Sequence, residues 1–239
     1  MKQTFFLCAV ACALFSAAPI HAGENAAAAV CHRIADTYGV KDFDNVEAIR
    51  YTFNAMRPNG DTISRSWEWQ PKTGEVTYHG MDANHQPMTR SYRRSDVSAD
   101  TSGALKRIDQ GFINDQYWLL FPFHLVWDSG VEYTLNGSQS LPIPPGTAQD
   151  MLVQYGAAGG YTPGDAYELF TDADNQIIQW IYHKGGNMQS TGAVTWQHNV
   201  HAGPIMVALE HYDADGKLRL WFSNVAVKVT GDDDWRKTK

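Results

Sequence analysis

Histidines are the first residues of this sequence to consider for chemistry, because imidazole is a common zinc ligand. Nine are present, and His198 and His201 stand three residues apart, with His211 ten residues further on. A helical HExxH motif places two histidines on one face, with a catalytic glutamate between them. Here Asn199 and Val200 intervene, in a segment that favours strand and loop, where positions three apart face opposite sides. We therefore expect no metal site and no cofactor.

Two acidic segments, Asp172–Asn175 and Asp213–Gly216, resemble fragments of a calcium-binding loop. Neither continues to the glutamate that completes such a loop, and both fall where a hairpin requires turn residues. The sequence contains no GxSxG motif, no Walker loop and no dinucleotide-binding fingerprint. The glycine-rich segment Gly156–Gly160 follows a predicted strand but does not open a convincing helix. We interpret all three segments as turns or connections.

An enzyme would need two titratable groups that converge in a pocket, and His124 is the best candidate for one of them. The stretch from Tyr117 to Trp127 is apolar except for this histidine. Its partner could be Glu168 or Glu210, provided that imidazole and carboxylate lie within hydrogen-bonding reach and open to the cavity. An enzyme of unknown reaction is therefore an alternative function, although we expect no catalytic residues.

Apolar and aromatic residues at predicted strand and helix positions are the positive signal for a function. A strongly curved sheet of about eight or more strands has room for a ligand, because one layer of side chains cannot fill it. The opposite interpretation is a solid core in an interaction domain whose partners bind an outer face. The candidate cavity residues are Phe53, Trp67, Trp69, Tyr78, Trp118, Leu120, Phe121, Phe123, Trp127, Trp180 and Trp196.

The N-terminal segment predicts export. Residues 1–22 combine a basic residue, an apolar run from Phe5 to Ala18 and a small residue before Gly23, which is typical of a cleavable signal peptide. A lipoprotein acylated at Cys12 is the alternative, but the apolar run before that cysteine is short. Cleavage leaves Cys31 as the single cysteine of the mature chain, so we expect a soluble periplasmic protein without an internal disulfide.

The composition predicts one acidic domain. The chain has a net charge of −7, and 44% hydrophobic residues are ample for a single core. A negative net charge opposes binding to nucleic acid, so we expect no nucleic-acid partner. We expect one domain over residues 23–230, followed by a charged, solvated tail over residues 231–239.

Changes in hydrophobic period indicate the elements that position these residues. An alanine-rich helix is expected over Asn25–Tyr38, and a period near 3.6 from Ser98 to Leu120 predicts an amphipathic helix. Pro122 should end that helix near Leu120, so that the following aromatic residues cross the mouth or wall of a sheet. Consecutive hairpins predict an antiparallel sheet that curls on itself. About eleven short strands are expected, within residues 49–53, 63–69, 76–78, 88–93, 131–135, 151–155, 167–170, 177–182, 193–198, 205–212, 218–222 and 225–229.

A short helix after the signal peptide leads into a first strand, an aromatic stretch, a turn before a strand and a closing set of strands. The segments after the helix are Ile49–Phe53, Tyr117–Phe123, Tyr161–Asp165, Trp180 with Tyr182, Trp196, Gly203 with Pro204, and Phe222–Val227. Together they resemble the superfamily of LolA and LolB, the periplasmic lipoprotein carrier and its outer-membrane receptor.

The resemblance implies an α+β fold of mainly antiparallel strands, an incomplete, half-open β-barrel with helices packed in or over its opening. It implies an exported carrier for lipid or lipoprotein acyl chains in an apolar interior, with a membrane protein or a lipoprotein as a further partner. In such carriers a basic residue helps to hold the lid, and Arg50 and Arg65 are the candidates in this chain. Together with His124, they are the polar residues that we expect in the cavity.

Overall fold

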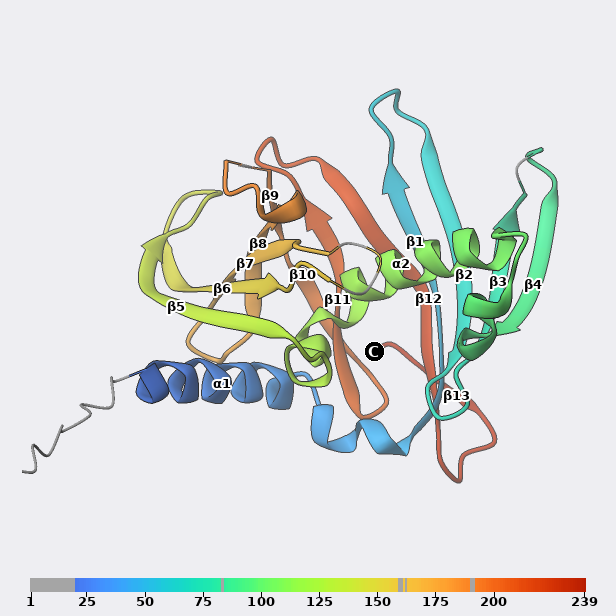
Figure 1. Ribbon diagram of the computed structural model, residues 1–239, viewed down its shortest axis with the longest axis horizontal. Coiled ribbons are helices and arrows are strands. Elements are labelled where there is room, and N and C mark those ends of the chain that lie inside the picture. The colour runs from blue at the N-terminus through green and yellow to red at the C-terminus, as the bar shows by residue number, and fades with distance from the viewer. Residues whose placement is uncertain (1–19, 83, 159–160, 162, 190–191) are drawn as a thin grey trace, which may run out of the picture.

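The computed structural model describes residues 20–82, 84–158, 161, 163–189 and 192–239. Two antiparallel sheets and a few helices make up this part of the chain, so the expected α+β class with mainly antiparallel strands is confirmed (Figure 1). Residues 1–19, which include Cys12 and most of the expected signal peptide, lie outside the described residues.

The larger sheet has the strand order β10-β11-β12-β1-β2-β3-β4, and β13 pairs with β12. Hairpins connect β1 to β4 in sequence, while β1 and β12 pair although they lie near opposite ends of the chain. The bounds are β1 Val46–Met56, β2 Thr62–Gln70, β3 Glu75–Met81, β4 Pro87–Arg93, β10 Gln197–Ala202, β11 Ile205–Tyr212, β12 Leu218–Val229 and β13 Trp235–Lys237.

The smaller sheet has the order β5-β6-β7-β8-β9. The two sheets meet at a corner, where β9 ends at Thr195 and β10 begins at Gln197. Trp196 lies between them, and its backbone N–H donates to the carbonyl of Ile178 at 2.8 Å. The described strands number thirteen where about eleven were expected: strand 193–198 is split at this corner, β13 was not foreseen, and the expected segments 218–222 and 225–229 form one strand, β12. The bounds are β5 Val131–Ser140, β6 Thr147–Tyr155, β7 Ala166–Thr171, β8 Ile177–His183 and β9 Ala193–Thr195.

The C-terminal segment 231–239, expected to be a solvated tail, contains β13. This short strand pairs with β12 through Ala226, Val227 and Lys228. The guanidinium of Arg50 lies 4.5 Å above the ring of Trp235. Backbone pairing and this cation–π contact keep the segment against the sheet.

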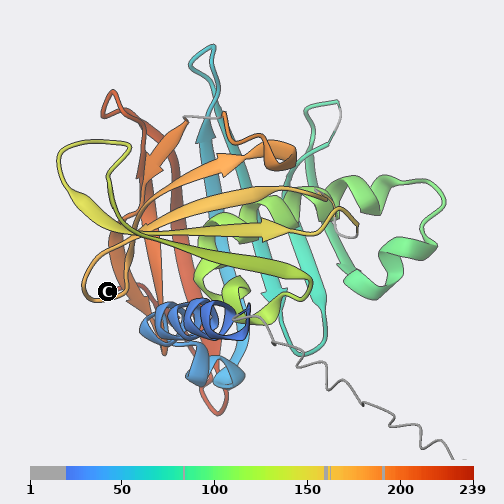
Figure 2. The ribbon, with the colours of Figure 1, turned by 60° about the vertical axis from the view of Figure 1, so that its left-hand side comes forward.

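Helix α2 (Ala104–Trp127) runs between the two sheets, and Figure 2 shows it behind the smaller sheet and in front of the larger one. Helix α1 (Ile20–Thr37) packs against α2 and β5. Three 3-10 helices complete the set: η1 (Val40–Asn45), η2 (Arg94–Ala99) and η3 (Lys184–Gly186). Within the described ranges, no helix has both the length and the apolar character that a membrane span needs.

The expected end of the amphipathic helix near Leu120 is a kink rather than an end. Leu120 has non-helical dihedral angles (φ −117°, ψ 18°), but the chain continues as helix to Trp127, so the prediction that the helix ends near Leu120 was wrong. The physical reason is that Pro122 lies in the first turn after the kink. A proline is well tolerated there, because the N–H that it lacks would have no helical partner.

Side chains from both sheets and α2 form one continuous core. Phe112, Leu119 and Phe121 of α2 are fully buried in it. The concave space between the sheets is therefore occupied by the helix itself.

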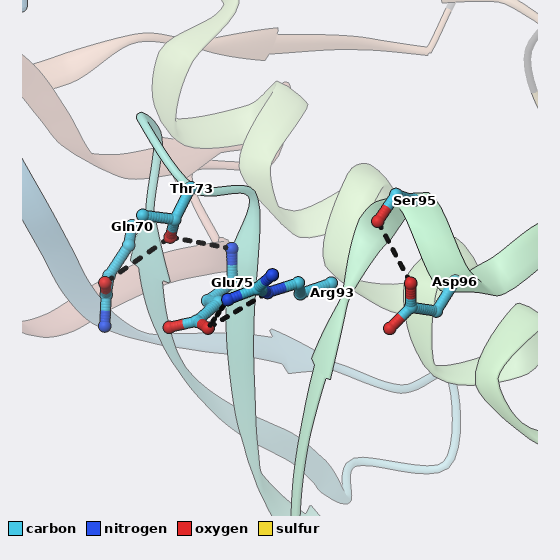
Figure 3. Close-up of polar contacts among 6 residues, drawn as sticks. All are labelled: Gln70, Thr73, Glu75, Arg93, Ser95 and Asp96. Atoms are coloured by element: carbon cyan, nitrogen blue, oxygen red, sulfur yellow. Dashed lines mark hydrogen bonds and ion pairs between the residues drawn. The ribbon is translucent and has the colours of Figure 1, made fainter.

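A polar cluster fixes the edge of the larger sheet, next to the start of α2 (Figure 3). Arg93 on β4 reaches across to the carboxylate of Glu75 on β3 at 2.9 Å, and the two residues are direct cross-strand partners. The Thr73 hydroxyl accepts a hydrogen bond from the backbone N–H of Glu75 at 3.3 Å. These contacts hold the strand end from which η2 begins.

Candidate ligand-binding groove

A groove with a volume of about 1450 Å³ runs along α2. It is bounded by α2, by the segment containing η2 and by the facing parts of β6, β7 and β8, and we call it the α2 groove. Aromatic rings and a few charged groups dominate its wall. The aromatic and charged lining residues are Trp69, Trp118, Trp127, Trp180, Tyr117, Tyr155, Tyr161, Tyr167, Tyr182, His124, Arg94, Lys106, Asp100, Asp109, Asp128 and Asp165.

Four of the eleven expected cavity residues line the α2 groove: Trp69, Trp118, Trp127 and Trp180. Trp127, at 37% exposure, is among the most exposed large apolar side chains of the described chain. The other seven are buried in the solid core and do not line this groove; they are Phe53, Trp67, Tyr78, Leu120, Phe121, Phe123 and Trp196.

A row of tyrosines in the α2 groove was missed from the sequence as a feature of the site. Ring centroids lie 6.2 Å apart for Tyr117 and Tyr155, 5.9 Å for Tyr155 and Tyr167, and 5.3 Å for Tyr167 and Tyr182. The available signal was the period of two along a strand: Trp180 and Tyr182 share one face of β8, and Tyr167 lies opposite Tyr182 on β7.

Asp128, directly after α2, is the centre of a hydrogen-bond cluster in the groove wall. Its Oδ2 accepts hydrogen bonds from the hydroxyls of Tyr117 at 2.5 Å and Tyr155 at 2.9 Å. Its Oδ1 lies 3.0 Å from Nδ1 of His124. Burial acts to raise the pKa of Asp128, but the hydrogen bonds from His124 and the two tyrosines outweigh it and lower that pKa. The carboxylate therefore stays ionised at neutral pH.

His124 is held on three sides. Its ring stacks on Tyr117 with 3.9 Å between centroids, and its Nε2 lies 3.2 Å from Oε1 of Gln116. The catalytic pairings considered from the sequence do not form, because Glu168 lies 3.1 Å from Nε2 of His183 and Glu210 lies 3.2 Å from Nδ1 of His198. His124 lines the groove as expected, with a different carboxylate as its partner.

The opposite side of α2 is attached to the larger sheet through Asp115, which is fully buried. Arg65 on β2 donates two hydrogen bonds to its carboxylate, at 2.7 Å from Nε and 2.5 Å from the terminal nitrogen. The indole N–H of Trp67 donates a third at 2.8 Å. Burial opposes the charge of Arg65, but the contact with Asp115 outweighs it and raises the pKa of the guanidinium. Arg65 thus holds the central helix, whereas Arg50 faces Trp235 outside the groove.

Asp109, one turn and a half earlier on α2, is a second attachment point. It accepts hydrogen bonds from the hydroxyls of Tyr92 at 2.9 Å and Tyr161 at 2.7 Å. Nε of Arg94 lies 3.1 Å from the same carboxylate. This cluster ties α2 to β4 and η2, and it closes one end of the groove.

The three histidines considered as zinc ligands are separated in the structure. His198 is exposed beside Glu210, and His211 is fully buried between the rings of Trp118 and Trp196. In the part of the chain that the structure describes, no group of three histidine, cysteine or acidic side chains could hold a metal ion.

No protein-family model and no curated protein matches the sequence. Two solved structures are similar to this one over most of its length, each with a TM-score of 0.48. A DUF1329 family protein from Desulfovibrio piger is 10% identical and is matched over 88% of this chain and 95% of its own. A LolA superfamily protein from Nitrosomonas europaea is 9% identical, with 88% and 97% covered.

A third similar structure is the MucA/MucB complex of Pseudomonas aeruginosa. Its matching chain is 15% identical, with a TM-score of 0.25 and coverage of 87% of this chain and 59% of that one. At these identities, the ligand and activity of the present chain must be inferred from its own side chains.

Proposed function

We propose that this protein is a binding or carrier protein that holds an elongated, largely apolar ligand in the α2 groove. The observation that carries the proposal is the aromatic wall: Trp69, Trp118, Trp127 and Trp180 all border a groove of about 1450 Å³. Small-molecule sites typically have volumes of roughly 300–1,000 Å³, so a groove of this size has room for a long ligand. Lipid or lipoprotein acyl chains are the ligands that fit it.

The energetics favour such a ligand. Each buried methylene contributes about 0.8 kcal/mol, so an alkyl chain of ten or more carbons offsets the cost of association without many polar contacts. Arg65 and Asp115 hold α2 against the larger sheet on the side away from the groove. A wall fixed in this way binds with less ordering cost than a mobile one.

The proposed site of action is the periplasm, and it rests on the expected signal peptide over residues 1–22. Expression of the whole chain tests this: a shorter mature chain that begins near Gly23 in the periplasmic fraction would support it. Retention of the uncleaved chain in the cytoplasm would contradict it.

Native mass spectrometry of the protein prepared without detergent is the test of the binding function. We expect a co-purifying lipid and saturable uptake of a fluorescent fatty acid. Replacing Trp118 by leucine should weaken uptake roughly tenfold, because it removes part of an aromatic wall. Trp221→Leu is the matched control, since Trp221 is outside the groove lining. Absence of both bound lipid and uptake would overturn the proposal.

A second candidate function is an enzyme on the same scaffold, and one observation favours it: the contact of His124 with Asp128 in the groove wall. Such a pair can move a proton. Incubation with ester lipids, followed by mass spectrometry of the products, distinguishes the two functions. Hydrolysis products that form with the parent chain but not with His124→Gln would favour the enzyme. Intact lipid bound to both the parent chain and the variant would favour the carrier.

A further inference from the structure

The part of the α2 groove next to the smaller sheet combines tyrosine rings with two carboxylates. Tyr155 and Tyr167 lie in the middle of the tyrosine row, with Asp128 at one side and Asp165 at the other. Asp165 is 3% exposed, and its oxygens accept hydrogen bonds from the Tyr182 hydroxyl and from the backbone N–H of Gly185, both at 2.7 Å. Both carboxylates line the groove.

Four aspartates, Asp109, Asp115, Asp128 and Asp165, differ in their partners. Asp109 and Asp115 each contact an arginine, Arg94 at 3.1 Å and Arg65 at 2.5 Å, so a fixed cation cancels each charge. Among the described residues, Asp128 and Asp165 contact no lysine or arginine within ion-pair distance; their partners are phenols, an imidazole and one backbone N–H.

The Asp128 carboxylate contacts the imidazole of His124 and the phenols of Tyr117 and Tyr155. It therefore lacks the fixed arginine partner that Asp109 and Asp115 each have.

Tyr167 lies between the two carboxylates. Burial, together with the charges of Asp165 and Asp128, raises its pKa, so the phenol stays neutral. Its ring stacks on Trp180 at 5.0 Å between centroids. Faces of neutral phenol and indole rings attract cations, most strongly where water is excluded.

The cationic side chains that line the groove are Lys106 and Arg94. Lys106 is in the first turn of α2, whereas Asp128 follows the last turn. Arg94 is paired with Asp109, and its charge also acts on the hydroxyl of Tyr117. The carboxylates of Asp128 and Asp165 add two negative charges to the groove of a chain that is itself acidic.

We propose that the ligand of the α2 groove carries an ammonium head, which binds over Tyr155 and Tyr167 between Asp128 and Asp165. This inference rests on the proposed binding function and adds the charge of the ligand to it. The apolar part of the ligand lies along Trp118 and Trp127, and the cation replaces water at the tyrosine row. A fatty acid would place its carboxylate against the same negative groups and bind less tightly.

Titration of tryptophan fluorescence with three decyl amphiphiles below their micelle concentrations tests the proposal: decyltrimethylammonium, decyl glucoside and decanoate. The alkyl chain is constant, so differences report the head. We expect decyltrimethylammonium to bind roughly tenfold more tightly than the neutral glucoside, and decanoate to bind weakest. Equal binding of all three would overturn the ammonium head while supporting the apolar groove. Absence of binding by all three would overturn both proposals.

Variants of the two carboxylates sharpen the test. Asp128→Asn and Asp165→Asn keep an oxygen acceptor for the tyrosines but remove the charge, so each should weaken binding of decyltrimethylammonium several-fold more than binding of the glucoside. Asp44→Asn, an exposed residue outside the groove lining, removes one charge elsewhere and should change neither. Circular dichroism verifies the fold of each variant. Equal loss for the cationic and neutral probes in a folded variant would contradict the assignment of these residues.

Discussion

The two sides of α2 use the same residue type in opposite ways. On the side of the larger sheet, Asp115 is fully buried and its charge is cancelled by the two-pronged contact with Arg65. On the groove side, Asp128 is partly exposed and receives hydrogen bonds from Tyr117 and Tyr155, without a guanidinium. A carboxylate paired with an arginine attaches the helix, whereas the Asp128 carboxylate has no arginine partner and lines the groove. The contrast separates the closed side of α2 from its open side.

Loss of the ion pair between Arg65 and Asp115, on the closed side of α2, should have the largest effect on stability. Arg65→Ala leaves Asp115 as a buried carboxylate without its cation, and we expect the free energy of unfolding to fall by about 3 kcal/mol. Urea unfolding followed by circular dichroism measures it. The matched control is Arg93→Ala, which removes an exposed arginine from the pair with Glu75 and should cost less than about 1 kcal/mol. Equal losses would remove the distinction between attachment and surface pairing.

Acid should destabilise the closed side through His211. Complete burial lowers the pKa of its imidazole from 6.5 to about 3. Between these values the unfolded chain binds a proton that the folded chain does not, so stability falls as the pH drops through 6.5. The His211 contribution between pH 7 and pH 5 is about 2 kcal/mol.

Urea unfolding at the two pH values, compared with His211→Gln, isolates this contribution. The variant should lose about 2 kcal/mol less between pH 7 and pH 5 than the parent chain, whatever other groups titrate. An identical pH dependence in both proteins would show that His211 takes up its proton as readily in the folded chain as in the unfolded one.

Loss of a single hydroxyl on the open side of α2 should reduce the stability of the fold less. Tyr155→Phe removes one of the two phenol hydrogen bonds to Asp128, and we expect a loss of about 1 kcal/mol in stability. Thermal unfolding by calorimetry is the measurement. Tyr212→Phe, which removes a hydrogen bond to Glu210 near the surface, is the comparison and should cost less.

The smallest effect on stability is expected for Asp128→Asn. Its free energy of unfolding should fall by less than about 1 kcal/mol at neutral pH, because the amide oxygen still accepts hydrogen bonds from the tyrosines. Asp115→Asn should cost at least twice as much, since Arg65 would be left facing a neutral group. Chemical unfolding of the two variants side by side decides the point. A larger loss of stability for Asp128→Asn than for Asp115→Asn would show that the carboxylate on the groove side contributes more to the fold.

The sequence allowed the fold class and most strand positions to be predicted, because period-two patterns and turn residues are local signals. Predictions from local sequence were wrong where contacts with residues distant in the sequence determine the backbone conformation. Pro122 was expected to end a helix, but packing of the following turn into the core continues it past the kink at Leu120. Strand 193–198 was expected to be continuous, but the corner at Trp196 turns the chain from one sheet to the other.

For the candidate site, residue types were easier to predict than their partners. Arg65 was identified as an inward-facing cation, yet its carboxylate lies 50 positions further along the chain, a separation that no spacing rule covers. His124 was expected in the cavity, but its contact with Asp128 was not predicted. The aromatic residues were identified as a group, and burial then divided them between core and groove.

Pairing of β1 with β12 has a consequence for how the chain is made. Thr52 and Asn224 are in contact across 172 positions, so the middle of the larger sheet cannot form until nearly the whole polypeptide is available. Closing so long a loop costs conformational entropy before native contacts offset it, and this slows folding. The half-made chain therefore presents β1 with one edge open, and a stop codon shortly before Leu218 would remove the strand that completes the sheet.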